Sequence, residues 1–112
     1  YNNGNHIRDF TYIEDIVEGL QRVVSSKKNY KYKIYNIGNS NPVKLMDFIN
    51  ILEDSLGIVA NKEYLPLQEG DMRDTYADIT DLEKDFDYKP KMSIEEGISK
   101  FVSWYKSFYK IQ

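Results

Sequence analysis

Two arginine–aspartate pairs are the side chains in this sequence best suited to recognising a ligand. Arg8 stands next to Asp9 near the start of the chain, and Arg73 stands next to Asp74 in a polar stretch. A guanidinium is planar and permanently charged, so it can donate two parallel hydrogen bonds to a phosphate or a carboxylate. Neighbouring charges are also common as surface ion pairs, which is the interpretation these residues favour by themselves.

The other polar groups give weaker signals. Asp71, Asp74, Asp78 and Asp81 could supply oxygen ligands, but their spacing lacks the alternation and the central glycine of an EF-hand loop. We therefore predict turn and capping roles for these aspartates and no metal site. His6, the single histidine, lies in a polar segment near the chain end and is expected to be a solvated side chain.

The residue patterns of common cofactor-binding and covalent mechanisms do not occur in the sequence. It has no G-x-G-x-x-G cradle for a dinucleotide, no tyrosine followed by lysine four positions later, no cysteine and no G-x-S-x-G elbow. From the residues alone we expect a ligand-binding or structural piece with no catalytic and no cofactor-binding residue.

Composition excludes several other classes of function. The net charge is only -3, with 15 basic residues mixed among 18 acidic ones, so nucleic-acid binding is not expected. No stretch is apolar and long enough for a signal peptide or a membrane span, and the simplest prediction is a cytoplasmic protein that does not bind membranes. The 112 residues are expected to form one domain, 1–112.

Helical periodicity predicts three main helices and one short one. The first covers about 11–27 with a capping box from Thr11, the second begins at Asn41 and Pro42 and ends at Gly57, and the last follows a capping box at Ser93. A short helix capped by Thr80 precedes the last one.

Two segments are predicted to be strands. Residues 30–37 are rich in aromatic and β-branched side chains, and residues 58–67 form a shorter candidate. The fold class is therefore α/β or α+β with few strands. Because two strands are marginal alone, they are expected to extend a sheet built elsewhere, which indicates a fragment of a longer protein.

Several motifs resemble those of extended short-chain dehydrogenase/reductases that act on nucleotide sugars. The run from Arg8 to Ile16 resembles the family signature R-D-[FY]-x-[YH]-[IV]-x-D, and Tyr35 to Gly38 resembles its late strand. Residues 70–78 resemble the substrate loop, and residues 88–105 resemble the end of the family's chain. The resemblance implies the C-terminal part of a Rossmann-type enzyme, with a small substrate-binding domain.

The resemblance also implies roles for individual residues. Arg8 corresponds to the arginine that reaches the ligand's diphosphate, and Asp71 to the acid that contacts the ribose or orders the loop. Gln68 and Arg73 are expected to lie near the phosphates or the sugar carboxylate. Gln68 to Asp71 is similar to the loop of UDP-glucuronate epimerases, whereas many UDP-glucose 4-epimerases have an arginine at the position of Gln68.

By this resemblance, the chain is the UDP-sugar-binding portion of an NAD-dependent epimerase. NAD would be bound by the full-length enzyme and not by these residues, whose partners would be the UDP-sugar and the enzyme's own N-terminal domain in a homo-oligomer. The alternatives are a fragment of a dTDP- or GDP-sugar dehydratase and a stand-alone, non-enzymatic binding module.

Overall fold

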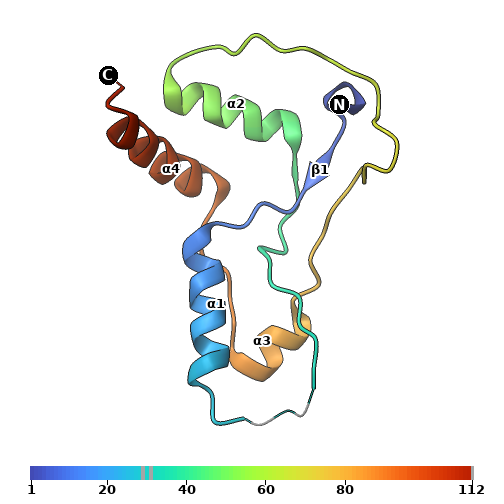
Figure 1. Cartoon of the computed structure of the whole chain (residues 1–112), viewed down its shortest axis with the longest axis vertical. Helices are drawn as coiled ribbons and strands as arrows, with labels where there is room; N and C mark the ends of the chain where they lie inside the picture. Colours follow the sequence, from blue (N-terminus) through green and yellow to red (C-terminus); the bar gives the residue numbers. More distant parts are fainter. Residues whose placement is uncertain (29, 31, 112) are drawn as a thin grey trace. The chain divides into compact units, whose positions relative to one another are not determined.

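The computed structural model describes residues 1–28, 30 and 32–111. In these residues it contains a 3-10 turn η1 (Asn2–Gly4), strands β1 (Ile7–Arg8) and β2 (Val43–Lys44), and helices α1 (Ile13–Ser25), α2 (Leu45–Leu56), α3 (Thr80–Phe86) and α4 (Ile94–Tyr109) (Figure 1). The chain divides into two compact units. The first consists of Tyr1–Arg8, Val43–Thr75 and Ser93–Gln112, and the second of Asp9–Pro42 and Tyr76–Met92.

In the first unit, β1 holds segments from two distant parts of the sequence. It pairs antiparallel with β2, with Ile7 opposite Lys44. Ile7 also forms a parallel bridge with Asp74. There the Ile7 N–H donates to the Arg73 carbonyl at 3.2 Å, and the Thr75 N–H donates to the Ile7 carbonyl at 3.0 Å. These bonds anchor one end of the polar segment before Thr75 beside β1.

The helices of the first unit confirm part of the prediction. Gly57 has a φ of 74° and caps α2 in the left-handed conformation, which glycine adopts without strain. Ser93 and Glu96 form the predicted capping box of α4. The predicted start of α2 at Asn41 is wrong, because Val43 and Lys44 pair with β1 and the helix begins only at Leu45.

The second unit is organised around a buried tyrosine. Tyr88 is fully buried and packs with Ile79 and Leu82, and its hydroxyl donates to the Gly38 carbonyl at 2.9 Å. Burial raises the pKa of Tyr88 to about 12. A Cβ at Gly19 would lie 3.1 Å from the Tyr88 ring, so a glycine at this position allows α1 to approach this core.

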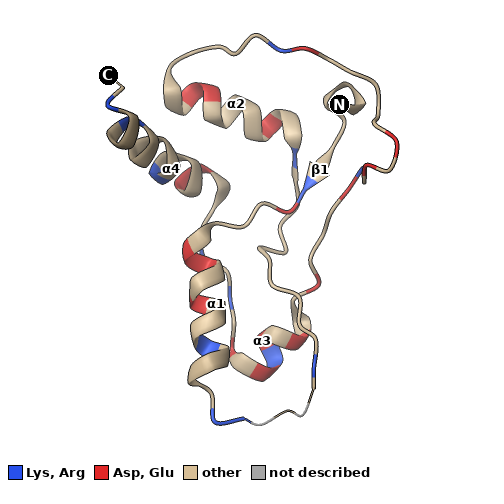
Figure 2. Cartoon of the chain, in the orientation of Figure 1, with Lys and Arg blue, Asp and Glu red and all other residues tan. Residues whose placement is uncertain are grey.

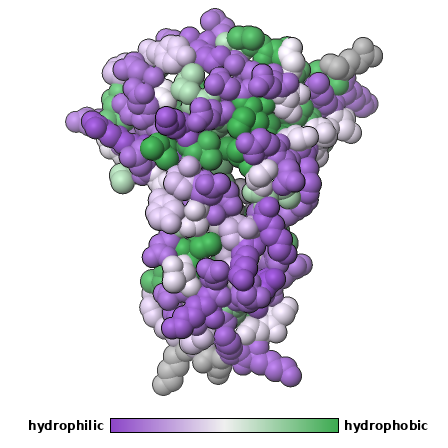
Figure 3. All heavy atoms as spheres, turned by 180° about the vertical axis from the view of Figure 1, so that it is seen from behind, coloured by the Kyte–Doolittle hydropathy of each residue, from purple (hydrophilic) through white to green (hydrophobic). Residues whose placement is uncertain are grey.

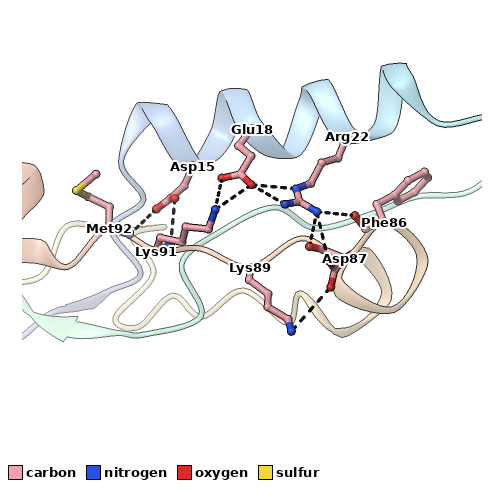
Figure 4. Close-up of polar contacts among 8 residues, drawn as sticks. All are labelled: Asp15, Glu18, Arg22, Phe86, Asp87, Lys89, Lys91 and Met92. Carbon is pink, nitrogen blue, oxygen red and sulfur yellow. Dashed lines mark hydrogen bonds and ion pairs between the residues drawn. The ribbon is translucent and has the colours of Figure 1, made fainter.

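A polar network joins α1 to the segment between α3 and α4 (Figure 4). The carboxylate of Asp15, which is buried, accepts hydrogen bonds from the backbone N–H groups of Lys91 and Met92, each at 3.1 Å. One turn further along α1, Glu18 accepts hydrogen bonds from Arg22. Arg22 in turn donates to the Asp87 carbonyl at 2.8 Å.

The predicted strands and two of the predicted caps are wrong. Residues 30, 32–37 and 58–67 form no strand, because no other segment of the described chain pairs with their backbone groups. Asn29 and Lys31 lie outside the described residues. Helix α1 begins after Tyr12 without a side-chain cap, so Thr11 does not form the predicted box. Thr80 is the first residue of α3, and its N–H and hydroxyl both donate to Asp78.

The most apolar face of α1 is exposed in this structure. Ile13, Leu20 and Val24 are 62%, 55% and 84% exposed, whereas the buried positions of the helix are Asp15 and Gly19. On the face seen in Figure 3, apolar side chains also gather over the unit that contains α2 and α4. None of the helices in the described part of the chain has the length and hydropathy of a membrane span.

Candidate functional site

Arg8 ties the end of β1 to the polar segment that precedes Thr75. Its Nη1 donates to the Arg73 carbonyl at 2.7 Å and to the Ile7 carbonyl at 3.0 Å. Its Nη2 donates to the Met72 carbonyl at 2.7 Å and lies 3.3 Å from Asp71 Oδ1. The planar fork of the guanidinium thus gathers acceptors from two parts of the chain, a geometry that a single ammonium group cannot supply.

A tight turn places Asp71 beside Arg8. The Asp71 N–H donates to the Gln68 carbonyl at 3.1 Å, and Gly70 has a φ of 82°, as expected for the third residue of a type II turn. The Asp71 side chain remains 34% exposed. The carboxylate is therefore held by the protein and still accessible to a ligand.

The structure adds His6 to this group. The residue is only 4% exposed, so the expectation of a solvated histidine is wrong. Its Nδ1 lies 3.1 Å from the Arg73 carbonyl, and its Nε2 lies 3.3 Å from Asp71 Oδ2. Both contacts join residues more than sixty positions apart in sequence, and no local pattern around His6 predicts them. We call His6, Arg8 and Asp71 the β1 cluster.

The four residues predicted to bind substrate are placed differently. Arg8 and Asp71 meet in the β1 cluster, whereas Gln68 and Arg73 have exposed side chains on the same loop. What these last two contribute to the β1 cluster is main-chain structure: the Gln68 carbonyl closes the turn, and the Arg73 carbonyl accepts from His6 and Arg8. In Figure 2 the ribbon is coloured red for acidic residues along this loop and blue for a basic residue at the end of β1.

Asp9, which follows Arg8 in the sequence, organises backbone in the second unit. Its carboxylate accepts hydrogen bonds from the backbone N–H groups of Ser40 at 2.9 Å, Asn41 at 3.3 Å and Ala77 at 3.0 Å. A Cβ at Gly38 would lie only 2.5 Å from the Ala77 side chain, so this part of the chain requires a glycine. The adjacent arginine and aspartate therefore have separate tasks.

A cavity of about 300 Å³ in the second unit offers a different surface. It is lined by Ile34, Asn36, Asp78, Thr80 and Asp81. Hydrogen bonds from the Thr80 hydroxyl and backbone N–H hold the pKa of Asp78 below its usual value. These contacts span two residues and agree with the predicted turn role of Asp78, whereas the N-cap residue of α3 is Ile79, without a side-chain cap. Among the described residues, no group of three metal-ligating side chains is close enough to hold a metal ion.

Comparison with known proteins identifies the family. The family model described as GDP-mannose 4,6 dehydratase matches residues 1–101. The chain belongs to this family. The match covers the whole β1 cluster and confirms the resemblance to nucleotide-sugar epimerases and dehydratases.

Relatives in this family include epimerases of a nucleotide sugar acid. The chain is 45% identical to Protein CapI of Staphylococcus aureus over 98% of this chain and 38% of that protein. It is 39% identical to a UDP-glucuronate 4-epimerase of Thermodesulfobacterium geofontis over 95% of this chain and 32% of that protein. The chain thus spans about a third of the length of these curated relatives.

A solved structure confirms the fold class. A UDP-glucuronic acid 4-epimerase of Bacillus cereus, in complex with UDP-glucuronic acid and NAD, is 31% identical and superimposes with a TM-score of 0.89. The match covers 97% of this chain and 35% of that protein. The chain therefore has the α/β structure of part of a Rossmann-type extended short-chain dehydrogenase/reductase.

Proposed function

We propose that this chain is the nucleotide-sugar-binding part of a UDP-glucuronate 4-epimerase and is inactive alone. The observation that carries the proposal is the convergence of Arg8 and Asp71, two residues 63 positions apart, on one partly exposed site. The similarity to epimerases of UDP-glucuronate supports the choice of substrate.

The distances around Arg8 suggest how one site could serve both phosphate and ribose. The bonds from Arg8 to the Met72 and Arg73 carbonyls are short, at 2.7 Å, whereas its contact with Asp71 is 3.3 Å long. In our proposal a diphosphate oxygen replaces Asp71 as the acceptor for Nη2 while the carbonyl bonds persist. Asp71 is then available to accept a hydrogen bond from a ribose hydroxyl. The exposed side chains of Gln68 and Arg73 would contact the phosphates or the sugar carboxylate.

Binding of this kind contributes to catalysis by positioning the substrate. Contacts to the nucleotide, remote from the reacting carbon, supply binding energy that orients the sugar. The residues of this chain do not fit NAD, since they include no glycine-rich dinucleotide cradle. NAD binding and hydride transfer are assigned to other parts of a longer, homo-oligomeric enzyme. Its cytoplasmic location stays a prediction.

A dehydratase is the second candidate. The matching family model is described as GDP-mannose 4,6 dehydratase. The sequence resemblance also extends to dehydratases of dTDP- or GDP-sugars. The two proposals differ in the nucleotide and sugar that the β1 cluster accepts. A non-enzymatic binding module would differ from both in having no partner domain for catalysis.

Calorimetric titration of the chain with UDP-glucuronate, UDP-glucose, GDP-mannose, dTDP-glucose and NAD tests these alternatives. We expect the tightest binding for UDP-glucuronate and no measurable heat for NAD. Preference for GDP-mannose or dTDP-glucose would favour the dehydratase. Binding of NAD, or of none of the nucleotide sugars, would contradict the proposal.

A further inference from the structure

His6 is a buried polar side chain that the proposed substrate contacts do not use. It precedes β1 directly, and its carbonyl accepts the Leu45 N–H at 2.8 Å, so its backbone is fixed at the start of α2. Its ring lies between two parts of the substrate loop, the Arg73 carbonyl and the Asp71 carboxylate. The Nε2 atom is buried but is not aligned for a hydrogen bond in this structure.

The two neighbours of the ring determine which nitrogen must carry hydrogen. A carbonyl oxygen can only accept, so the 3.1 Å contact with Arg73 requires a proton on Nδ1. A neutral ring would then turn the lone pair of Nε2 toward Asp71, which is unfavourable against a carboxylate. A ring with a hydrogen on each nitrogen would instead present an N–H group to each of the two acceptors.

We infer that His6 is a positioning residue that holds Asp71 in place for the nucleotide sugar. Its Nδ1–H fixes the loop backbone at Arg73. Its Nε2 lies 3.3 Å from Asp71 Oδ2, and a small rotation of that carboxylate completes the hydrogen bond that holds Asp71. Arg8, which also contacts this carboxylate, lies against the opposite oxygen, Oδ1. If the Nη2–H of Arg8 donates to a phosphate oxygen in place of Asp71, His6 remains the group that orients Asp71.

The effect of His6 on ligand binding rests on the proposed function, whereas its contacts with Arg73 and Asp71 are independent of that function. Loss of the Nε2 contact frees the Asp71 carboxylate to rotate, so a ribose hydroxyl would meet a less organised acceptor. Loss of the Nδ1 contact loosens the loop backbone instead. The two ring nitrogens therefore have separable effects, which an imidazole that only fills space would not have.

Two amide substitutions separate the nitrogens. The amide of His6→Asn can reach the position of Nδ1, and the longer His6→Gln can reach that of Nε2, while His6→Ala removes both donors. We expect His6→Asn and His6→Ala to weaken UDP-glucuronate binding by about tenfold or more, the loss expected for one hydrogen bond to a charged group. His6→Gln should stay within about threefold of the wild type. Equal losses in His6→Asn and His6→Gln, at equal stability in urea, would overturn the inference.

A spectrum of the ligand-free chain tests the positioning role of His6 independently of substrate binding. In the nitrogen-15 spectrum of the histidine ring, we expect a proton on Nδ1, and Asp71→Asn should alter the Nε2 signal more than the Nδ1 signal. An unprotonated Nδ1, or an Nε2 signal indifferent to Asp71→Asn, would refute the inference even if UDP-glucuronate binds. If the chain binds no nucleotide sugar, the proposed function fails, while the ring spectrum still decides the role of His6.

Discussion

Replacing Arg8 tests how strongly the loop of residues 68–75 depends on one guanidinium. Its side chain is 24% exposed and makes two 2.7 Å bonds to the Met72 and Arg73 carbonyls, besides its longer contacts. A hydrogen bond to a charged group contributes about 1.5–3 kcal/mol, but these carbonyls can be rehydrated when the loop opens. We therefore expect Arg8→Ala to lower the free energy of loop opening by about 2 kcal/mol in total, or about thirtyfold in the opening equilibrium.

Hydrogen exchange of the Thr75 amide reports this opening, because that amide donates to β1. Arg8→Ala should speed its exchange by about thirtyfold, and Arg8→Lys by roughly fivefold, since one ammonium cannot reproduce the fork to both carbonyls. Replacement of the exposed Lys27 by alanine is the matched control and should leave the rate unchanged. Exchange in Arg8→Ala within twofold of the wild type would refute this account of the loop.

Three further predictions concern the second unit. Asp15→Ala leaves the N–H groups of Lys91 and Met92 without their acceptor, so it should lower the free energy of unfolding in urea by about 2–4 kcal/mol. Asp15→Asn should lower it less, and a loss below about 1 kcal/mol in Asp15→Ala would contradict the network. The pKa of Tyr88 is raised to about 12, so its contribution to stability is complete below the ordinary value of 10 and is lost as pH rises through 12. Urea unfolding across this range should show a smaller decline for Tyr88→Phe, and an identical decline would refute the assignment. The exposed face of α1 should make the chain self-associate in sedimentation, and Leu20→Glu should shift it toward monomer; a monomeric wild type at high concentration would count against this prediction.

Local signals in the sequence predict most of the helices. The box at Ser93 and the left-handed cap at Gly57 depend on residues within one helical turn, and both occur in the structure. The start of α2 depends instead on pairing between Val43–Lys44 and β1, which lies more than thirty positions earlier. The helix start was therefore misplaced, since no local pattern shows this pairing.

The strand predictions are wrong for a related reason. Residues 30–37 have the aromatic and β-branched composition of a strand, but the described part of the segment has no strand partner. Composition describes a preference, whereas a strand exists only when another segment satisfies its backbone groups. The short pairs that do form, at β1 and β2, are too brief to leave a periodic signal.

The candidate site was only partly predictable. The resemblance singled out Arg8 and Asp71, and the structure brings them together. It could not show that Arg8 is held mainly by loop carbonyls, because any residue can supply a backbone carbonyl. His6 was misjudged because burial of a polar residue near the start of the chain depends on a loop more than sixty residues away.

Mapping the binding of UDP-glucuronate by amide chemical shifts tests the central claim most directly. In a titration of the nitrogen-15-labelled chain, the account predicts that the largest changes occur at residues 6–8 and 68–75, around the β1 cluster. Saturating changes should disappear in Arg8→Ala and persist in Lys27→Ala. Changes centred instead on the cavity beside Asn36 and Asp78, or no changes at all, would contradict a nucleotide-sugar site at the β1 cluster.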